Sequence, residues 1–365
     1  MQLQQLSGRR RLHGTTTPEL FFDLKYIFQM MESLGSSRIE GNRTTIADLV
    51  DARIENPRTK DEKLHEISNI DAATEFIESE IRPGDEITHA HVREAHKIIV
   101  DGLALPPKGE GDATPGRYRE QDVAIAGAKH RPPSYPDVLG LMDELLSFLN
   151  DGGNDQFAFI RVALVHHRFT WIHPFTNGNG RTVRLITYAS LIQKGFNVAD
   201  GRIINPGAVF FSDRDTYNNM LAAADAGTED GLLMWCRYVL EGLLREFQKI
   251  DRLLDIEDLR KQVLIPAIKQ CRRRGEIDAT DERILLLAAE EQIIAARDVH
   301  ALLKKTYQTA QRRMRKLKDR KLLCKSAHEK QHYRLAFANN ALMRSVVSAL
   351  QSEGFFKGLD ESDFQ

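Results

Sequence analysis

Residues 173–184 read HPFTNGNGRTVR, and this stretch decides how the rest of the chain is interpreted. It lies between two apolar segments with helical spacing. Gly178 and Gly180 permit backbone dihedrals that other residues avoid, so successive N–H groups can converge at the start of the second helix. Such a concave group of N–H donors, supported by the helix dipole, binds phosphate. The stretch therefore predicts a phosphate-binding site at a helix N-terminus.

Three ionisable side chains flank this predicted site. Arg181 and Arg184 are three residues apart on the second helix, so both guanidinium groups project from one face and can bind the outer phosphates of a nucleotide. His173 precedes the glycines, where a neutral imidazole can take the proton of an incoming hydroxyl. The pattern predicts group transfer to a hydroxyl; the plainer alternative is a helix N-cap followed by surface arginines.

The stretch resembles the signature HPFx[DE]GNGRxxR of the Fic family, whose members mostly transfer AMP from ATP to protein side chains. The resemblance implies that His173 is the general base. It also implies that Gly178, Asn179 and Gly180 form the anion hole for the α- and β-phosphates. The enzyme expected is thus a nucleotidyltransferase, a protein adenylyltransferase with ATP as its substrate and a Ser, Thr or Tyr hydroxyl of a protein, including its own chain, as the acceptor.

The resemblance also assigns the remaining nucleotide contacts. Arg181 would hold the β-phosphate, Arg184 would reach the γ-phosphate, and Tyr217 falls where relatives place a residue that lines the nucleotide pocket. Asn177 departs from the pattern, because relatives usually carry Asp or Glu there to bind Mg²⁺, and an amide oxygen is a weaker ligand for a hard cation. Asn177 is therefore expected to be a weak Mg²⁺ ligand, and a different transferred group stays open.

A second motif, SSRIEGN at residues 36–42, follows an amphipathic helix that the spacing of apolar residues predicts over residues 18–34. It resembles the inhibitory pattern [ST]xxxE[GN] of the same family, with Ser36, Glu40 and Gly41 in the required positions. If this helix docks beside the anion hole, the Glu40 carboxylate can pair with Arg184 in a bidentate geometry and occupy the group that the γ-phosphate needs. The resemblance thus implies an autoinhibited enzyme. Some relatives use this glutamate to remove AMP from a target, so a deAMPylase is an alternative.

Residues 101–136 are rich in glycine and proline and contain short strand-like pieces near residues 122–126. They predict a long functional loop with a β-hairpin. This segment is similar to the Fic flap, a hairpin that lays the target across the active site by main-chain pairing.

The C-terminal part of the chain is strongly basic. Residues 304–334 carry twelve Lys or Arg residues against two acidic residues, Asp319 and Glu329, although the whole chain has a net charge of −1. Three predicted helices and a two-stranded wing give this part the order of a winged helix-turn-helix. Its third helix, TAQRRMRKLKDR, predicts DNA contact; the alternatives are a solvated helix face or a protein partner.

The fold expected is all-α: a Fic helical bundle with a β-hairpin flap and a C-terminal winged helix-turn-helix domain. The boundaries are residues 1–84 for an N-terminal helical segment with the inhibitory helix, 85–254 for the catalytic core, 255–280 for a connector, 281–340 for the winged module and 341–365 for a tail. A homodimer stays open, because relatives with this inhibitory helix are often dimeric.

The composition of the chain bears on its cellular location and on metal binding by its Cys and His residues. The chain has no long apolar run and no apolar segment behind its basic start, so we expect a cytoplasmic protein without a membrane span. Cys236, Cys271 and Cys324 are far apart and lack CxxC spacing, which argues against disulfides or a cysteine zinc site. His166 and His167 are expected to pack rather than to bind metal. The second hypothesis for function is a DNA-associated regulator whose Fic domain senses a nucleotide with little turnover.

Overall fold

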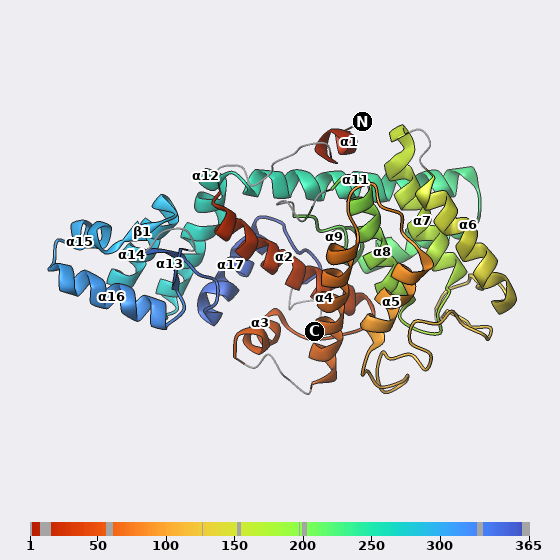
Figure 1. The fold of residues 1–365 in the computed structure, drawn as a ribbon, viewed down its shortest axis with the longest axis horizontal. Coiled ribbons are helices and arrows are strands. Elements are labelled where there is room, and N and C mark those ends of the chain that lie inside the picture. The colour runs from red at the N-terminus through yellow and green to blue at the C-terminus, as the bar shows by residue number, and fades with distance from the viewer. Residues whose placement is uncertain are drawn as a thin grey trace.

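The computed structural model describes residues 2–7, 16–55, 61–125, 127–151, 155–196, 198, 203–326 and 331–359. In this part of the chain, a helical body continues into a smaller C-terminal module, giving an elongated molecule (Figure 1). The helices are α1 (Gln2–Ser7), α2 (Pro18–Ile39), α3 (Ile46–Glu55), α4 (Glu62–Glu80), α5 (His89–Val100), α6 (Val138–Asn150), α7 (Ala158–Ile172), α8 (Asn179–Gln193), α9 (Ala208–Phe211), α10 (Arg214–Asp225), α11 (Glu229–Leu253), α12 (Ile256–Leu259), α13 (Ile265–Arg273), α14 (Ala279–Glu291), α15 (Ala296–Leu303), α16 (Tyr307–Asp319) and α17 (Asn340–Ser352). The strands are β1 (Ile294–Ala295), β2 (Leu323–Lys325) and β3 (His332–Leu335).

Helix α8 forms the centre of the body. It packs against α2, α4, α5 and α7, and its side chains from residue 181 to residue 193 are buried on every side. A helix buried all round must satisfy its polar side chains internally. The hydroxyls of Thr182, Thr187 and Ser190 do so by donating to the carbonyl four residues earlier. The core therefore fixes α8 and, with it, the loop at its N-terminus.

Helix α2 crosses the middle of the molecule and is longer than the sequence predicted. The amphipathic pattern indicated a helix over residues 18–34, whereas the helix begins at Pro18 and ends at Ile39. It includes Ser36 and places Glu40 at its C-cap, after which Gly41 adopts a φ of 104° that favours glycine. The predicted inhibitory motif is thus the end of a buried helix. Among the described residues, no helix has the length and apolar character needed to cross a membrane.

The predicted β-hairpin in residues 101–136 is wrong for the described part of that segment. A tight turn forms at Gly127 (φ 74°), where the Ala128 N–H donates to the Ile125 carbonyl, but residues 122–125 and 127–136 form no strand. Pro132 and Pro133 lack the N–H groups that a ladder requires. Residue 126 lies outside the described residues. The segment remains a loop without a partner strand to pair with.

The C-terminal module has the order helix, strand, helix, helix, strand, strand, formed by α14, β1, α15, α16, β2 and β3. The strands make an antiparallel sheet in the order β1-β3-β2, in which Ile294 is opposite Tyr333 and Leu323 is opposite Leu335. The two strands of the predicted wing are present, and β1 adds a third. The tip between β2 and β3 lies outside the described residues.

Two segments are more ordered than the sequence indicated. The predicted connector, residues 255–280, forms α12, a π-helical turn and α13, and the predicted tail, residues 341–365, contains α17. Helices α13 and α17 pack on each other. The charge of residues 255–280 indicated a connector, but apolar residues at helical spacing between the charged ones are buried: Leu259, Val263, Ala267, Ile268 and Cys271.

Candidate active site

The site is built on the loop that joins α7 to α8. Its two ends have left-handed backbone conformations: His173 caps α7 with a φ of 52°, and Gly178 precedes α8 with a φ of 72°. The buried Asn179 side chain pins the loop, because its Oδ1 accepts from Phe175 N and its Nδ2 donates to Phe175 O, both at 2.9 Å. The N–H groups of the first helical turn have no intrahelical acceptor, so the loop and α8 leave donors for an anion.

The His173 imidazole is neutral. Burial lowers its pKa to about 4, with the positive charge of Arg119 contributing, so the ring is uncharged at neutral pH. Its Nδ1 faces the Thr170 carbonyl at 3.4 Å. This contact favours the tautomer with the proton on Nδ1, which leaves Nε2 as the proton acceptor.

Arg119 fixes the position of His173, and no motif in the sequence pointed to it. Its buried guanidinium donates from Nε to the His173 carbonyl (2.9 Å) and from Nη2 to the carbonyls of Ile172 (3.3 Å) and Pro133 (2.5 Å). Its backbone N–H donates to the Pro174 carbonyl at 2.8 Å. One arginine thus ties the end of α7 to the loop segment 117–136.

His96 and Asp112, which the sequence did not reveal as site residues, support the loop between α7 and α8. His96 on α5 stacks on Phe175 with ring centroids 3.7 Å apart, and its Nε2 lies 3.1 Å from the Asn177 carbonyl. Asp112 accepts from Thr176 Oγ1 (2.6 Å) and from Asn177 N (2.9 Å). Although burial opposes it, these hydrogen bonds lower the pKa of Asp112, so the carboxylate is charged.

Arg184 lies 4% exposed and is bound by the end of α2. Its Nε donates to Ser36 Oγ (2.8 Å), and its Nη2 donates to Ser36 O (2.9 Å) and to Glu40 Oε1 (2.8 Å). The expected bidentate pairing is wrong in detail, since Glu40 contributes one oxygen, to Nη2, and Ser36 accepts from Nε and Nη2. Burial opposes the charge on Glu40, but the guanidinium of Arg184 outweighs it and lowers the pKa of Glu40.

Gly180 admits the Glu40 carboxylate to the first turn of α8. A Cβ at this position would lie 2.2 Å from Glu40 Oε1, closer than any side chain tolerates. The structure therefore brings Ser36, Glu40, Gly180 and Arg184 together. Gly41 ends the helix behind them and makes no contact with the loop that the structure records.

Arg181 turns toward a different set of partners. Its Nη2 donates to the Glu110 carbonyl (2.7 Å), and its guanidinium lies 3.3 Å from Glu66 Oε1 and 3.5 Å from Glu110 Oε2. Glu66 is itself held by Asn42, whose Nδ2 donates to Glu66 Oε2 at 2.8 Å. Arg181 is thus a buried arginine whose guanidinium lies between two carboxylates.

The side-chain amide of Asn177 is held by Glu110 and Gly111, in the loop that follows α5. Its Nδ2 donates to the Gly111 carbonyl (3.1 Å) and to Glu110 Oε2 (3.3 Å). Among the described residues, no group of three or more His, Cys, Asp or Glu side chains is arranged to hold a metal ion. A Mg²⁺ ion at this place would have to arrive with phosphates and use the Glu110 carboxylate and the Asn177 amide oxygen.

Tyr217 lies buried behind Arg184 rather than at the surface of an open pocket. Its hydroxyl lies 2.9 Å from His166 Nε2, and His166 Nδ1 lies 2.7 Å from Thr187 Oγ1. Burial raises the pKa of Tyr217 to about 12 and lowers that of His166. His166 is thus a hydrogen-bonded core histidine.

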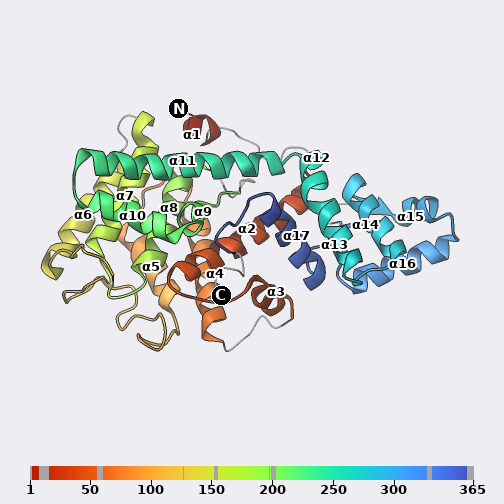
Figure 2. The same cartoon turned by 180° about the vertical axis from the view of Figure 1, so that it is seen from behind.

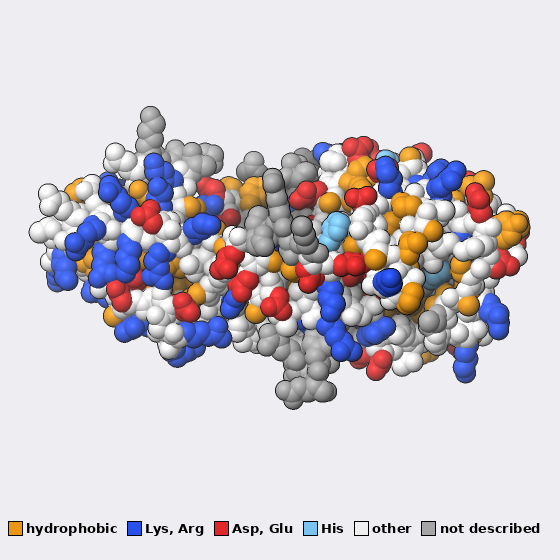
Figure 3. All heavy atoms as spheres, turned by 90° about the horizontal axis from the view of Figure 1, so that it is seen from below, with side chains coloured by type: hydrophobic (Ala, Val, Ile, Leu, Met, Phe, Trp, Pro, Cys, Tyr) orange, Lys and Arg blue, Asp and Glu red, His pale blue; other side chains and the backbone are white. Residues whose placement is uncertain are grey.

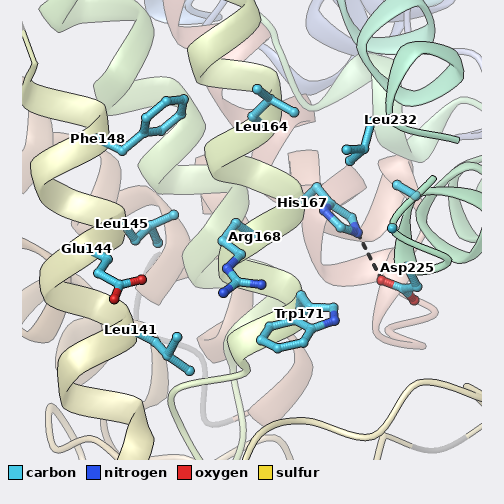
Figure 4. A pocket seen from close by; sticks show the side chains of 12 residues that line it. Leu141, Glu144, Leu145, Phe148, Leu164, His167, Arg168, Trp171, Asp225 and Leu232 are labelled. Carbon is cyan, nitrogen blue, oxygen red and sulfur yellow. Dashed lines mark hydrogen bonds and ion pairs between the residues drawn. The ribbon is translucent and has the colours of Figure 1, made fainter. Parts of the chain in front are cut away.

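The outer face of α7 carries an open groove of about 520 Å³, shown in Figure 4. His167 Nε2 lies 2.9 Å from Asp225 Oδ1 on one side, and the Arg168 guanidinium stacks over Trp171 at 4.0 Å on the other. The Trp171 carbonyl lies 2.9 Å from His130 Nε2, so the groove adjoins the loop segment 117–136. Glu144 and several apolar side chains also line it: Leu141, Leu145, Phe148, Leu164 and Leu232.

Comparison with known proteins agrees with this geometry. Residues 86–191 match the model of the Fic/DOC family. A protein adenylyltransferase Fic of Nematostella vectensis is 30% identical over 197 residues, which are 53% of this chain and 42% of that protein. The corresponding protein of Aedes aegypti is 31% identical over 178 residues, 47% of this chain and 33% of that protein. The chain thus spans less than half the length of these relatives.

Solved structures share the fold at lower identity. A Fic family protein of Desulfovibrio desulfuricans G20 superposes with a TM-score of 0.55 at 20% identity, covering 92% of this chain and 94% of that one. A Fic domain containing signaling protein of Bacteroides thetaiotaomicron VPI-5482 superposes with a TM-score of 0.54 at 20% identity, covering 70% of this chain and 97% of that one.

Proposed function

We propose that the protein is an adenylyltransferase that moves AMP from ATP to a protein hydroxyl. The proposal starts from the match of residues 86–191 to the Fic/DOC family and from the adenylyltransferases that resemble this chain. The observation that carries the proposal is the pairing of Arg184 with Ser36 and Glu40 at the N-terminus of α8, beside a neutral His173. A buried cation held by its own chain next to free N–H donors suits a site that exchanges one anion for another.

The residues present can perform the transfer in one displacement. Nε2 of His173 takes the proton of the target hydroxyl, the hydroxyl oxygen attacks the α-phosphorus of ATP, and pyrophosphate leaves. The N–H groups of residues 178–180 stabilise the charge on the α- and β-phosphates, and Arg181 holds the β-phosphate. The anion hole is fixed before substrate arrives, because Asn179 and Asp112 already pin the loop.

The inhibition follows from competition for Arg184. While Ser36 and Glu40 accept its hydrogen bonds, the guanidinium cannot bind the γ-phosphate. The carboxylate also lies where the first turn of α8 has no side chain, at Gly180. ATP then lacks the contact that aligns its α-phosphorus with the incoming hydroxyl.

Magnesium fits this site as a partner of the nucleotide. Mg²⁺ prefers oxygen ligands and is usually held by one or two carboxylates together with substrate phosphates. Glu110 provides one carboxylate beside Asn177. When bound, the ion would neutralise charge on the β-phosphate, while the residues of this chain orient the ATP.

The protein target is proposed to lie along the loop segment 117–136. Arg119 anchors this segment to His173, so a hydroxyl presented there lies near the base. The apolar groove on α7 begins at the same segment and offers contacts for neighbouring target side chains.

The test is transfer of label from α-labelled ATP to the chain itself. We expect Glu40→Gly to raise self-labelling by about tenfold or more, because it frees a charge-assisted contact worth roughly 1.5–3 kcal/mol. Glu86→Gly, at an exposed loop position between α4 and α5, is the matched control and should label like the unaltered chain. Addition of His173→Ala should abolish the labelling. Equal labelling in the Glu40→Gly and Glu86→Gly variants would refute the inhibitory role of Glu40.

A second candidate function is contact with duplex DNA through the C-terminal module, which we propose to be a winged helix-turn-helix. Arg313, Lys316 and Arg320 on α16 lie within ion-pair distance of Asp278 or Asp281. The opposite face of α16 carries exposed cations without a described carboxylate nearby: Arg312, Arg315 and Lys318. Figure 3 shows Lys and Arg side chains gathered over this end of the molecule. Such a face suits the phosphates of a duplex.

A further inference from the structure

Helix α2 joins the C-terminal module to the nucleotide site. Its 22 residues span about 33 Å at the usual helical rise. Figures 1 and 2 show it running from the module into the middle of the body. Its C-terminal end carries Ser36 and Glu40, which hold Arg184, while its N-terminal end lies beside the β2–β3 hairpin.

The N-terminal end of α2 is bound to the module by polar contacts. Arg334 on β3 pairs with Asp23, and Ser326 Oγ donates to Glu19 Oε1 at 3.3 Å. The backbone N–H of Thr17, the N-cap residue of α2, donates to Gln292 Oε1, which follows α14, at 2.8 Å. Three separate segments of the module therefore fix the start of one helix.

The middle of α2 and the helix that follows it, α3, contact α17 and the segment after it, and α17 packs on α13, the helix that precedes the module. Phe28 packs edge-on against Phe355 and Phe356, which follow α17, with ring centroids 5.4 and 4.9 Å apart. Arg344 on α17 pairs with Asp51 on α3. A displacement of the module must either break its polar contacts with α2 or move α2, and a displacement that carries α17 along must break these contacts too.

We infer that the C-terminal module sets how firmly Glu40 holds Arg184, and that a partner that separates the β2–β3 hairpin from α2 relieves the inhibition. The predicted effect on labelling rests on the proposed adenylyltransferase function, whereas the control of the end of α2 by the module does not. Packed helices move as units rather than deform continuously. Gly35 shows how closely α2 fits the body, since a Cβ there would lie 2.2 Å from the Phe211 ring. A small shift of α2 is therefore enough to misplace its terminal carboxylate.

The contact between α2 and the hairpin can be reached from solvent. A cleft of about 390 Å³ opens beside the Asp23–Arg334 pair. Lys321 also lines it, so two cations, Arg334 and Lys321, face the Asp23 carboxylate across the cleft, whereas Arg53, which lines it too, is paired with Asp71. This balance favours an anionic group as the competitor that takes Arg334 from Asp23.

Hydrogen exchange tests the structural part on the full chain without nucleotide. In Arg334→Gln and in Asp23→Asn we expect the amides of residues 33–42 to exchange roughly two- to thirtyfold faster, the range for a residue that modulates coupling without touching either site. Arg315→Gln, an exposed arginine of the same module, is the matched control and should exchange at the unaltered rate. Unchanged exchange at residues 33–42, in a variant whose residues 17–24 exchange faster, would overturn the inference. Equal acceleration throughout α8 would also overturn it, because it would mean general destabilisation.

Self-labelling tests the consequence. Arg334→Gln and Asp23→Asn should label more than the unaltered chain and less than Glu40→Gly. Combining Arg334→Gln with Glu40→Gly should add nothing, because both act through Glu40; a further increase in the double variant contradicts the inference. If Glu40→Gly itself transfers no label, the proposed function fails, whereas the exchange rates still decide whether the module controls the end of α2.

Discussion

Replacement of Ser36 by alanine tests the hold of α2 on Arg184 without removing a charge. Ser36 Oγ accepts from Arg184 Nε at 2.8 Å, and both side chains are buried. In Ser36→Ala the inhibited state loses a hydrogen bond to a charged group, which contributes about 1.5–3 kcal/mol. The released state, in which Arg184 is free, keeps its contacts with ATP. The ratio of released to inhibited protein therefore rises by about tenfold to a hundredfold, since 1.4 kcal/mol corresponds to a factor of ten.

The lower end of this range is expected, because Nη2 of Arg184 keeps its bonds to the Ser36 carbonyl and to Glu40. The assay is the initial rate of self-labelling from α-labelled ATP, together with the Kd values of ATP and ADP. Only ATP should bind more tightly, since ADP has no γ-phosphate to reach Arg184.

Ser37→Ala is the matched control for this measurement. Ser37 is also buried on α2, but its hydroxyl donates to the Leu34 carbonyl and not to Arg184. Its loss should leave the labelling rate unchanged. The reasoning is refuted if Ser36→Ala and Ser37→Ala label alike while Glu40→Gly is active, or if ADP gains as much affinity as ATP.

Three further predictions follow from the charges of the site and of the module. Burial lowers the pKa values of His96 and His173 to about 4, so the unfolded chain binds more protons than the folded chain between pH 6.5 and about 4. The urea midpoint should therefore fall as the pH drops through this window, and His96→Gln should reduce the fall; a midpoint independent of pH would contradict the assignment. Asn177→Asp places a second carboxylate near Glu110, whose Oε2 lies 3.3 Å from the present amide. Repulsion between the two carboxylates should lower the urea midpoint without metal, and the added oxygen ligand should tighten Mn²⁺ binding in the presence of ATP, as measured by electron paramagnetic resonance. Arg315→Gln should lower the salt-dependent retention of the chain on duplex DNA, with Arg297→Gln on α15 as the control, and equal retention would argue against α16 as the contact face.

The loop that joins α7 to α8 and the end of α2 at Glu40 could be predicted as local structures because their residues lie close together in the sequence. Gly178, Asn179 and Gly180 act through the backbone of one loop, and the spacing of Ser36 and Glu40 is one turn of a single helix. Such local patterns carry their own geometry, and the fold brings the two patterns together as the resemblance implied.

The supporting residues could not be predicted, because their roles exist only after folding. Arg119, His96, Asp112 and Glu66 come from separate elements and make their contacts with backbone carbonyls, N–H groups or one distant side chain. No spacing in the sequence distinguishes them from surface arginines or core histidines. The missing hairpin has a similar cause, since a strand requires a partner and the described part of residues 101–136 has none.

The buried pair of Arg184 and Glu40 is best explained by exchange of partners rather than by stability. Taking two charges out of water costs several kcal/mol, and well-packed apolar residues of similar size often stabilise a core as well or better. Arg184 nevertheless lies 4% exposed and is held by a segment that precedes it by more than 140 residues. The N-terminus of a helix, with its free N–H donors, is also where a phosphate binds most favourably, and Arg184 lies on the second turn of α8. The same guanidinium can therefore be satisfied by Glu40 or by a nucleotide, and the helix that carries Glu40 decides which of them it meets.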